Sequence, residues 1–295
     1  MNQPIIETIQ LSKHYGKNRG IEEVSLTIPE GEIFGFIGPN GAGKSTTIRI
    51  LLNLIFPSSG TARIMGLDVV RESKEIRSRT GYIPSEASPY ASLKVCEFLE
   101  YMLRFYPVRK DDQRISDLCE RFELDRSRKM EDLSTGNRKK VSIVQSLLHR
   151  PELLILDEPT TGLDPLMQET FFEVLREENR NGMTIFFSSH VLSEVQRLCK
   201  RVAIIREGKI AGVEEIEALR KKQLKKVSIE FLVPEEREKF NLPHIESLVF
   251  GPGSVLTFFH SGDINALIRT VSGKHIRDLT IEEPSLEEIF MHYYR

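Results

Sequence analysis

A glycine-rich loop between an apolar run and a helix-like segment constrains this chain most strongly. The apolar run is Ile33-Phe34-Gly35-Phe36-Ile37, the loop is Gly38-Pro39-Asn40-Gly41-Ala42-Gly43-Lys44-Ser45-Thr46, and the helix-like segment runs from Thr46 to Leu54. Strand, loop and helix in this order form a concave nest of backbone N–H groups, and the positive end of the helix dipole points into that nest. The sequence therefore predicts a site for a polyphosphate, which we call the phosphate loop (Gly38–Thr46).

Individual residues of the phosphate loop have distinct expected roles. Gly41 and Gly43 permit backbone turns that a Cβ atom would forbid, Lys44 can reach the outer phosphates, and the Ser45 hydroxyl can ligate Mg²⁺. The other loop residues are expected to surround the phosphates, chiefly through backbone amides: Gly38, Pro39, Asn40, Ala42 and Thr46. The alternative interpretation is a glycine turn followed by an exposed lysine.

Composition excludes some classes of protein. The 41 Lys and Arg residues against 43 Asp and Glu residues give a net charge of -2, which offers no bulk electrostatic argument for a nucleic-acid binder. The three cysteines, Cys96, Cys119 and Cys199, are widely spaced and indicate a reducing compartment. No apolar run approaches the roughly 18–20 residues that cross a bilayer, and Met1–Pro4 does not resemble a signal peptide. We therefore expect a cytosolic chain.

Hydrophobic patterning predicts an α/β fold. Residues 5–37 alternate apolar and polar positions between turns, which is typical of short antiparallel strands. Later runs at 153–156, 184–187 and 202–205 are continuously apolar, as in strands buried on both faces. Because helical segments separate these runs, we expect a parallel core sheet.

Two further regions complete the expected organisation. A helical insertion is predicted at about residues 88–150, because apolar residues recur there at helical spacing: Phe98, Met102, Phe105, Ile115, Leu118 and Phe122. Residues 214–226 are highly charged and favour a helix end followed by a linker, with a domain boundary near Lys225. Residues 226–295 alternate strand-like and helix-like segments and are expected to form a small α+β domain.

A second motif, which is acidic, extends the predicted phosphate site. The apolar run Leu153–Leu156 ends in Asp157 and Glu158, and successive strand residues point in different directions. We expect Asp157 to hold Mg²⁺, directly or through water, and Glu158 to polarise an attacking water. A helix cap or a surface feature is the alternative for an isolated Asp-Glu pair.

Together with Leu133-Ser134-Thr135-Gly136-Asn137, here called the signature segment, these motifs resemble the ATPase subunit of an ATP-binding cassette (ABC) transporter over residues 1 to about 225. The resemblance implies a P-loop NTPase fold with an antiparallel β subdomain, a RecA-like parallel-sheet core and the helical insertion. It also implies that Ser134 and the Gly136 backbone contact the γ-phosphate held by a partner subunit. Taken alone, the segment would be an N-cap and turn.

Three further matches to the family carry implied roles. Asp164, within Gly162-Leu163-Asp164-Pro165, corresponds to a residue that connects the two sites across a dimer. His190, after Phe187-Ser188-Ser189, corresponds to a histidine that hydrogen-bonds the γ-phosphate and helps to orient water. Tyr15, followed by Gly16, corresponds to the aromatic residue that stacks on adenine. An ordinary turn, a structural histidine and simple packing are the respective alternatives.

The chain departs from the family pattern at two places. The usual glutamine after Tyr82-Ile83-Pro84 is replaced by Ser85, so either Ser85 or the following Glu86 is expected to contact Mg²⁺ and water. The signature segment carries Thr135 and Asn137 where glycine and glutamine are commoner. Because Ser134 and Gly136 are retained, the resemblance still implies an active site.

The resemblance implies ATP and Mg²⁺ as cofactors and ATP hydrolysis as the reaction, with Glu158, His190 and Lys44 as catalytic residues. It further implies a dimer of nucleotide-binding subunits and a separately encoded transmembrane permease, so that the chain would be peripheral on the cytoplasmic face of the membrane. Two alternatives stay open: an ABC ATPase that acts on ribosomes or nucleic acid, and a regulatory subunit that binds ATP without hydrolysing it. Near-neutral charge disfavours the first, and the retained catalytic residues disfavour the second.

The last residues narrow the resemblance. The segment 283–290, Glu-Pro-Ser-Leu-Glu-Glu-Ile-Phe, resembles the closing segment of exporter ATPases that handle drugs, antibiotics, lipids or sodium. Ser285 is an expected N-cap, and Leu286, Ile289, Phe290 and Tyr293 form an apolar stripe. The stripe is equally typical of a docked terminal helix, and the sequence does not name the cargo.

Overall fold

The computed structural model describes residues 4–85, 92–221, 225–233, 235, 240, 242–243, 245–251, 253–282 and 288. The chain divides into two compact units, Met1–Glu214 and Glu215–Arg295, which we describe separately. The predicted boundary near Lys225 between the nucleotide-binding domain and the C-terminal domain remains a prediction.

The first unit begins with an antiparallel sheet of order β2-β1-β4-β5. Its strands are β1 (Pro4–Tyr15), β2 (Asn18–Pro29), β4 (Ser59–Ile64) and β5 (Leu67–Asp68). The predicted antiparallel strands are confirmed, although β1 and β2 have 12 residues each and are longer than expected. The register of their pairing shifts between Thr8 and Leu11, and the two strands continue to pair on both sides of this irregularity.

A six-stranded sheet of order β10-β9-β3-β8-β7-β6 forms the centre of this unit. Its strands are β3 (Ile33–Ile37), β6 (Thr80–Ile83), β7 (Leu153–Asp157), β8 (Thr184–Ser189), β9 (Arg201–Arg206) and β10 (Lys209–Glu215). Strands β9, β3, β8, β7 and β6 pair in parallel, and every residue of β3, β7 and β8 is buried. The predicted parallel core sheet is confirmed, and the carboxyl ends of its strands meet at one edge.

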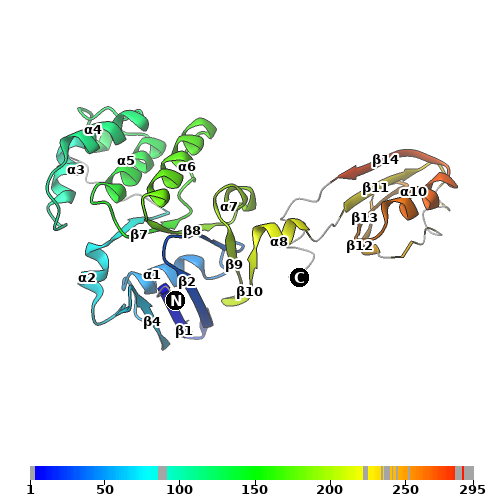
Figure 1. The fold of residues 1–295 in the computed structure, drawn as a ribbon, viewed down its shortest axis with the longest axis horizontal. Helices are drawn as coiled ribbons and strands as arrows, with labels where there is room; N and C mark the ends of the chain where they lie inside the picture. Colours follow the sequence, from blue (N-terminus) through cyan, green and yellow to red (C-terminus); the bar gives the residue numbers. More distant parts are fainter. Residues whose placement is uncertain are drawn as a thin grey trace. The chain divides into compact units, whose positions relative to one another are not determined.

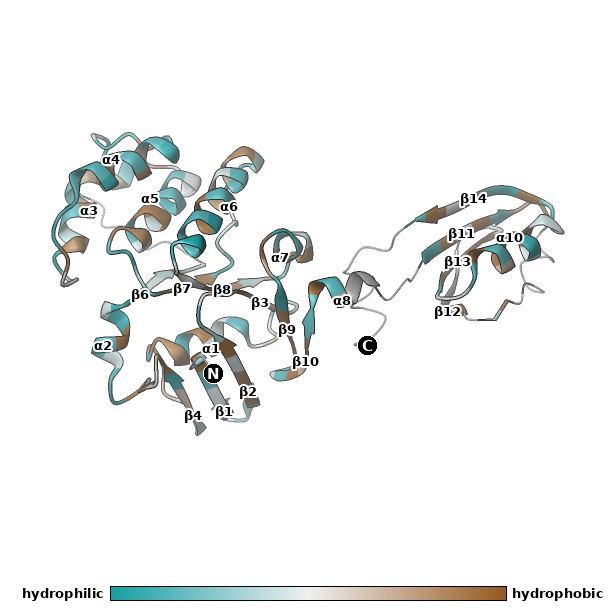
Figure 2. Ribbon diagram, in the orientation of Figure 1, coloured by the Kyte–Doolittle hydropathy of each residue, from teal (hydrophilic) through white to brown (hydrophobic). Residues whose placement is uncertain are grey.

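Helices pack against this sheet, and those between residues 92 and 150 fall within the predicted helical insertion. They are α1 (Lys44–Leu51), α2 (Ser73–Ser78), α3 (Val95–Leu103), α4 (Asp112–Arg121), the 3₁₀ helix η1 (Met130–Asp132), α5 (Thr135–Leu147), α6 (Pro165–Arg180) and α7 (Leu192–Leu198). The helices α3, α4 and α5 gather on one side of the sheet next to α6 (Figure 1). Hydrophilic and hydrophobic residues alternate along α4, α5 and α6, as expected for helices that bury one face (Figure 2).

One expected helical position differs from the structure. Phe105 continues the spacing of Phe98 and Met102, but α3 ends at Leu103. Phe98 is buried, whereas the Phe105 residue is 63% exposed. The apolar period therefore runs past the helix, because the chain leaves helical geometry before Phe105 can join the core.

The second unit contains α8 (Ile216–Lys221) and a small α+β arrangement. Its sheet, of order β12-β13-β11-β14, is antiparallel and consists of β11 (Lys225–Phe231), β12 (Ile245–Phe250), β13 (Val255–His260) and β14 (Ile276–Glu282). Helix α10 (Ile264–Ser272) adds Leu267 and Val271 to a core shared with Val227, Ile229 and Phe258. The predicted helix from Ser285 lies outside the described residues, except for Glu288.

Within the described parts of both units, no helix combines the length and the apolar character needed to cross a membrane.

Candidate active site

The phosphate loop connects β3 to α1 at the carboxyl edge of the central sheet. Gly41 and Gly43 have φ angles of 78° and 110°, which L side chains rarely adopt. A Cβ at Gly38 would lie 2.2 Å from the carbonyl oxygen of Ile205, so the loop also needs glycine for close packing. Helix α1 begins at Lys44, two residues before the expected start, and its first N–H groups therefore border the loop.

A pocket of 490 Å³ opens beside the phosphate loop. Its lining joins the loop to the first hairpin and to β7: Tyr15, Arg19, Gly20, Asn40, Gly41, Gly43, Lys44, Ser45, Thr46 and Glu158. Most of these residues were predicted from sequence, but Arg19 and Gly20 were not. Gly20 had a usable signal, because a glycine soon after an aromatic residue permits close packing of the ring.

Lys44 is buried beneath this pocket. Its ammonium group donates to the carbonyl oxygens of Gly38, at 2.7 Å, and Pro39, at 3.2 Å. The same nitrogen lies 3.2 Å from Oε1 of Glu158. Lys44 is therefore fixed by the loop that it completes, and it is already paired with the carboxylate that follows β7.

Asp157 and Ser45, the two residues expected to ligate Mg²⁺, lie within hydrogen-bond distance of each other. Asp157 ends β7 with only 1% of its surface exposed, and its Oδ1 accepts hydrogen bonds from Ser45 Oγ at 3.0 Å and Ser188 Oγ at 3.1 Å. A carboxylate and a hydroxyl this close together suit Mg²⁺, which prefers hard oxygen ligands. The sequence did not identify Ser188, which holds the carboxylate from the neighbouring strand β8.

Glu158 lies between two basic side chains. Its Oε1 faces Lys44, and its Oε2 lies 3.2 Å from Nδ1 of His190. The backbone of Glu158 has a φ of 49°, which is uncommon for a residue other than glycine, and its N–H donates to the Ser188 carbonyl at 3.2 Å. This turn directs the two adjacent acids differently, as the strand geometry predicted. The structure brings Lys44, Glu158 and His190 together.

Tyr15 lies at the end of β1 beside the pocket, with 46% of its surface exposed. A Cβ at Gly20 would lie 2.9 Å from Tyr15 Cε2, so that glycine makes room for the ring. The Lys13 ammonium lies 5.5 Å from the ring centroid on the same strand. The ring is supported from the protein side and accessible at the pocket, a geometry that suits stacking on a nucleobase.

The signature segment lies outside the pocket lining. Ser134 is exposed, caps α5 and accepts a hydrogen bond from the Asn137 N–H at 3.3 Å. Gly136 packs so closely that a Cβ there would lie 2.7 Å from the Gly162 carbonyl oxygen. Asp164 caps α6 by accepting from the Met167 N–H at 3.0 Å. Both segments are thus locally ordered as caps, and their predicted roles across a dimer remain predictions.

Ser85 lies two residues beyond β6, where its carbonyl oxygen and that of Pro84 accept hydrogen bonds from Lys139. The two distances from Lys139 Nζ are 3.1 Å and 2.8 Å respectively. Among the described residues, no contact of the Ser85 hydroxyl bears on its predicted role toward Mg²⁺, and Glu86 lies outside them. Sequence patterns did not single out Lys139, which reaches this segment from α5.

Burial dominates the electrostatics around this site. Burial lowers the pKa of Lys139 to about 8, while the negative charges of Asp157 and Glu158 act in the opposite direction. Burial also raises the pKa of Tyr82 to about 12, and the charge of Asp157 adds to that increase.

A phosphate loop after β3, a buried aspartate that ends β7 and the glutamate that follows it define a P-loop ATPase. The family model for ABC transporters matches residues 21–161. The bacitracin transport ATP-binding protein BcrA of Bacillus licheniformis is 35% identical over 302 residues, covering 97% of this chain and 96% of its own. The chain therefore belongs to the ATP-binding proteins of ABC transporters and is an ABC-type ATPase.

Other relatives and solved structures agree with this assignment. The linearmycin resistance ATP-binding protein LnrL of Bacillus subtilis is 29% identical over 302 residues, covering 97% of both chains. A solved ATP-binding subunit of an ABC transporter is 31% identical, with a TM-score of 0.70 over 74% of this chain and 92% of its own. An ATP-binding cassette solved as a dimer with ADP and Pi is 23% identical, with a TM-score of 0.66 over 72% of this chain and 98% of its own. At this identity the likeness supports the fold alone.

Proposed function

We propose that this chain is the ATP-hydrolysing subunit of an exporter and that it energises a separately encoded membrane permease. Closure of a dimer on ATP and its opening after hydrolysis would drive alternating access in that permease. The observation that carries the proposal is the position of Glu158. One carboxylate is held between the phosphate-loop lysine, Lys44, and His190 at the mouth of a nucleotide-sized pocket.

The residues of the site have separate roles in hydrolysis. Lys44 and the backbone amides of the phosphate loop neutralise the phosphates, and Ser45 with Asp157 would hold Mg²⁺. When bound, Mg²⁺ supplies charge neutralisation to the phosphate oxygens. Glu158 orients and polarises water, and His190 stands beside it to contact the γ-phosphate. Tyr15 stacks on the adenine.

The signature segment supports a second subunit. Ser134 is exposed at the N-terminus of α5, where the helix dipole favours an anion, yet it is not part of the lining of this chain's own pocket. We infer that it faces the γ-phosphate in the phosphate loop of a partner. Because one chain contains both halves, a homodimer would have two complete sites.

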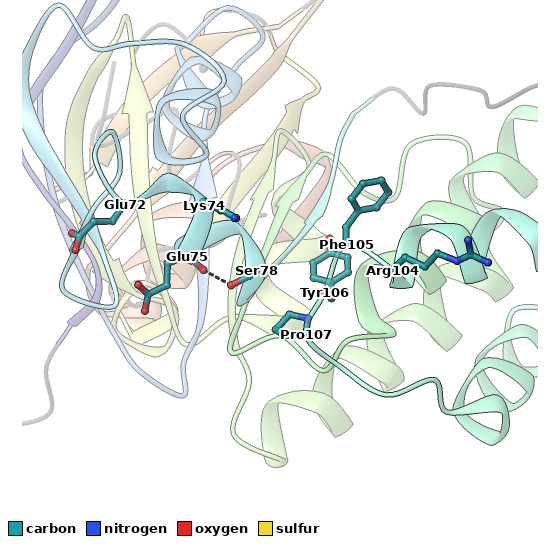
Figure 3. A pocket seen from close by; sticks show the side chains of 8 residues that line it. All are labelled: Glu72, Lys74, Glu75, Ser78, Arg104, Phe105, Tyr106 and Pro107. Carbon is teal, nitrogen blue, oxygen red and sulfur yellow. Dashed lines mark hydrogen bonds between the residues drawn. The ribbon is translucent and has the colours of Figure 1, made fainter.

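A second pocket offers a surface for the permease. The α2–α3 groove, a pocket of 620 Å³, is lined by Glu72, Lys74, Glu75, Ser78, Arg104, Phe105, Tyr106 and Pro107. Figure 3 shows Lys74, Glu75 and Ser78 on α2, Glu72 just before that helix, and the other four side chains on the segment that follows α3. An exposed aromatic ring with charges of both signs around it suits an amphipathic helical segment. We assign this groove to a cytoplasmic segment of the permease.

Helix α5 connects the α2–α3 groove to the signature segment. Tyr106 stacks on His149 with ring centroids 3.7 Å apart, and His149 lies just beyond the C-terminus of α5. Ser134 caps the other end, about 20 Å away for a helix of this length. A displacement at the groove can therefore be carried along one rigid helix to the residue proposed to contact the partner's nucleotide.

Co-purification tests the permease assignment. Phe105→Asp should abolish recovery of the native membrane protein with the tagged chain, because the charge enters the α2–α3 groove. Phe56→Asp is the matched control, since Phe56 is 64% exposed and Phe105 is 63% exposed. Equal recovery with both variants would remove the groove from the proposal.

The relatives support export, because one is a bacitracin transport protein and another a linearmycin resistance protein. In this proposal the chain is cytoplasmic and bound to the inner face of the membrane through the permease. The cargo is recognised by the permease.

Gel filtration with ATP tests the hydrolytic cycle. Glu158→Gln should bind ATP but stall turnover, which yields a long-lived ATP-bound dimer. A variant that remains a monomer with ATP bound, or a monomeric protein that hydrolyses ATP at the wild-type rate, would overturn the assignment.

A further inference from the structure

We propose that Lys139 is a positioning residue that ties the signature helix α5 to the backbone beside the metal site. Its ammonium group donates to the carbonyl oxygens of Pro84, at 2.8 Å, and Ser85, at 3.1 Å. Lys139 is 3% exposed, so water does not replace these bonds readily. The inference rests on the dimer proposed above, because it assigns a route between the partner's nucleotide and this chain's own site.

Lys139 lies close to Ser134 on the same helix, α5. Ser134 is the N-cap, and Lys139 lies five residues later, so little more than one helical turn separates them. A turn of α-helix is rigid on this length scale. Any movement of Ser134 toward a partner's γ-phosphate therefore moves the base of the Lys139 side chain as well.

The two carbonyl oxygens that accept from Lys139 lie beside the strand that ends in Asp157. Pro84 and Ser85 follow β6, whose last residue, Ile83, pairs in register with Leu156 on β7. The next residue of β7 is Asp157, the buried carboxylate that accepts from Ser45. Lys139 is thus hydrogen-bonded to the chain just after β6, the strand that pairs with β7 beside the proposed magnesium site.

A lysine can make this connection where a neutral apolar residue cannot. The ammonium group has three donors and no acceptor, and two backbone carbonyl oxygens at the end of a strand need donors. Burial lowers the pKa of Lys139 to about 8, and the charges of Asp157 and Glu158 act in the opposite direction. The tether itself consists of the two hydrogen bonds to the carbonyl oxygens of Pro84 and Ser85.

Three substitutions separate this tether from a structural role. Lys139→Met keeps the volume but removes the donors, and we expect kcat to fall about tenfold or more while ATP binding without Mg²⁺ stays within about twofold. Lys139→Gln keeps N–H donors for the carbonyl oxygens, and kcat should stay within about threefold of wild type. Lys140→Met is the matched control, because Lys140 is the next residue of α5 and is also buried.

The outcomes discriminate clearly. Loss of kcat in Lys139→Met with rescue by Lys139→Gln supports the tether. An equal loss in Lys139→Met and Lys140→Met, a Lys139→Gln variant as impaired as Lys139→Met, or a loss of ATP binding as large as the loss of kcat would overturn it. Failure of the dimer is recognised separately, because Glu158→Gln would then stay monomeric with ATP whatever residue occupies position 139.

Hydrogen exchange provides a measurement that requires no change at Lys139. In the Glu158→Gln protein, addition of ATP should slow amide exchange in peptides that cover α5 and in peptides that cover residues 80–85, over the same range of ATP concentration. Protection of α5 without a change in residues 80–85 would show that the two segments move independently and would overturn the proposal.

Discussion

The ammonium nitrogen of Lys44 lies 3.2 Å from Oε1 of Glu158, so the cation proposed to bind the phosphates and the carboxylate proposed to polarise water are paired with each other. The same carboxylate contacts His190 through Oε2. Phosphates that enter the pocket compete with Glu158 for Lys44, because both are anionic. In the proposed mechanism, nucleotide binding would therefore release one carboxylate oxygen of Glu158 for the orientation of water.

Lys44→Ala should weaken ATP binding by about 100-fold, because the buried cation that contacts the outer phosphates is lost. Titration with a fluorescent ATP analogue measures this change. Lys200→Ala, which removes an exposed lysine at the protein surface, serves as the control and should bind like wild type. Equal affinities for Lys44→Ala and wild type would contradict the assignment of the phosphate loop.

Asp157→Asn should reduce ATP hydrolysis by about 1000-fold and remove the effect of Mg²⁺ on ATP affinity, since the anionic ligand is lost. Chelation of Mg²⁺ should stop the wild-type enzyme in the same way. Ser188→Ala provides the comparison, because it removes one hydrogen bond to Asp157 without removing a proposed ligand. Its rate should fall by no more than about tenfold, and an equal loss in both variants would refute Asp157 as the ligand.

Tyr15→Ala should raise the KM for ATP about fivefold to tenfold, because stacking of a base on an aromatic ring contributes about 1–3 kcal/mol. Tyr15→Phe should behave like wild type, since the ring rather than the hydroxyl contacts the base. Steady-state kinetics with ATP decide the matter. A KM for Tyr15→Ala equal to that of Tyr15→Phe would leave Tyr15 with a packing role.

Folding stability should depend on pH through His149. Burial lowers the pKa of this histidine from its ordinary value of 6.5 to about 4. Between these two pH values the unfolded chain therefore binds more protons than the folded chain. The free energy of unfolding keeps its full value above pH 6.5 and falls as the pH drops toward 4, by up to about 3 kcal/mol. Urea unfolding at pH 7 and pH 5 measures the loss.

His149→Phe preserves an aromatic ring against Tyr106 but cannot be protonated. The stability difference between pH 7 and pH 5 should therefore be smaller in this variant than in wild type. Identical pH dependence in the two proteins would show that another group is responsible.

Local sequence predicted the parts of the site that a continuous motif encodes. The phosphate loop, Asp157 and Glu158 follow from a glycine pattern and from an apolar strand that ends in acids, and the structure places Lys44, Ser45, Asp157, Glu158 and His190 together. The parallel core sheet was predictable for the same reason, since β7, β8 and β9 are continuous apolar runs.

Long-range contacts were not predictable in this way. Ser188 and Lys139 join the site through side chains from β8 and α5, and nothing in their immediate sequence distinguishes them from neighbouring serines and lysines. Strands β4 and β5 complete the first sheet by pairing with β1 and with each other. Phe105 shows the opposite error, because helical spacing continues in the sequence after the helix itself has ended.

The most direct test of a site shared between two chains mixes two inactive variants. Lys44→Ala disables the phosphate loop and Ser134→Arg blocks the signature segment, so each homodimer should be inactive. A mixed dimer combines the intact loop of one chain with the intact signature segment of the other. Random mixing should restore up to about one quarter of the wild-type ATPase rate, because half of the dimers are mixed and each has one of two sites. A mixture no more active than its components would contradict the shared site.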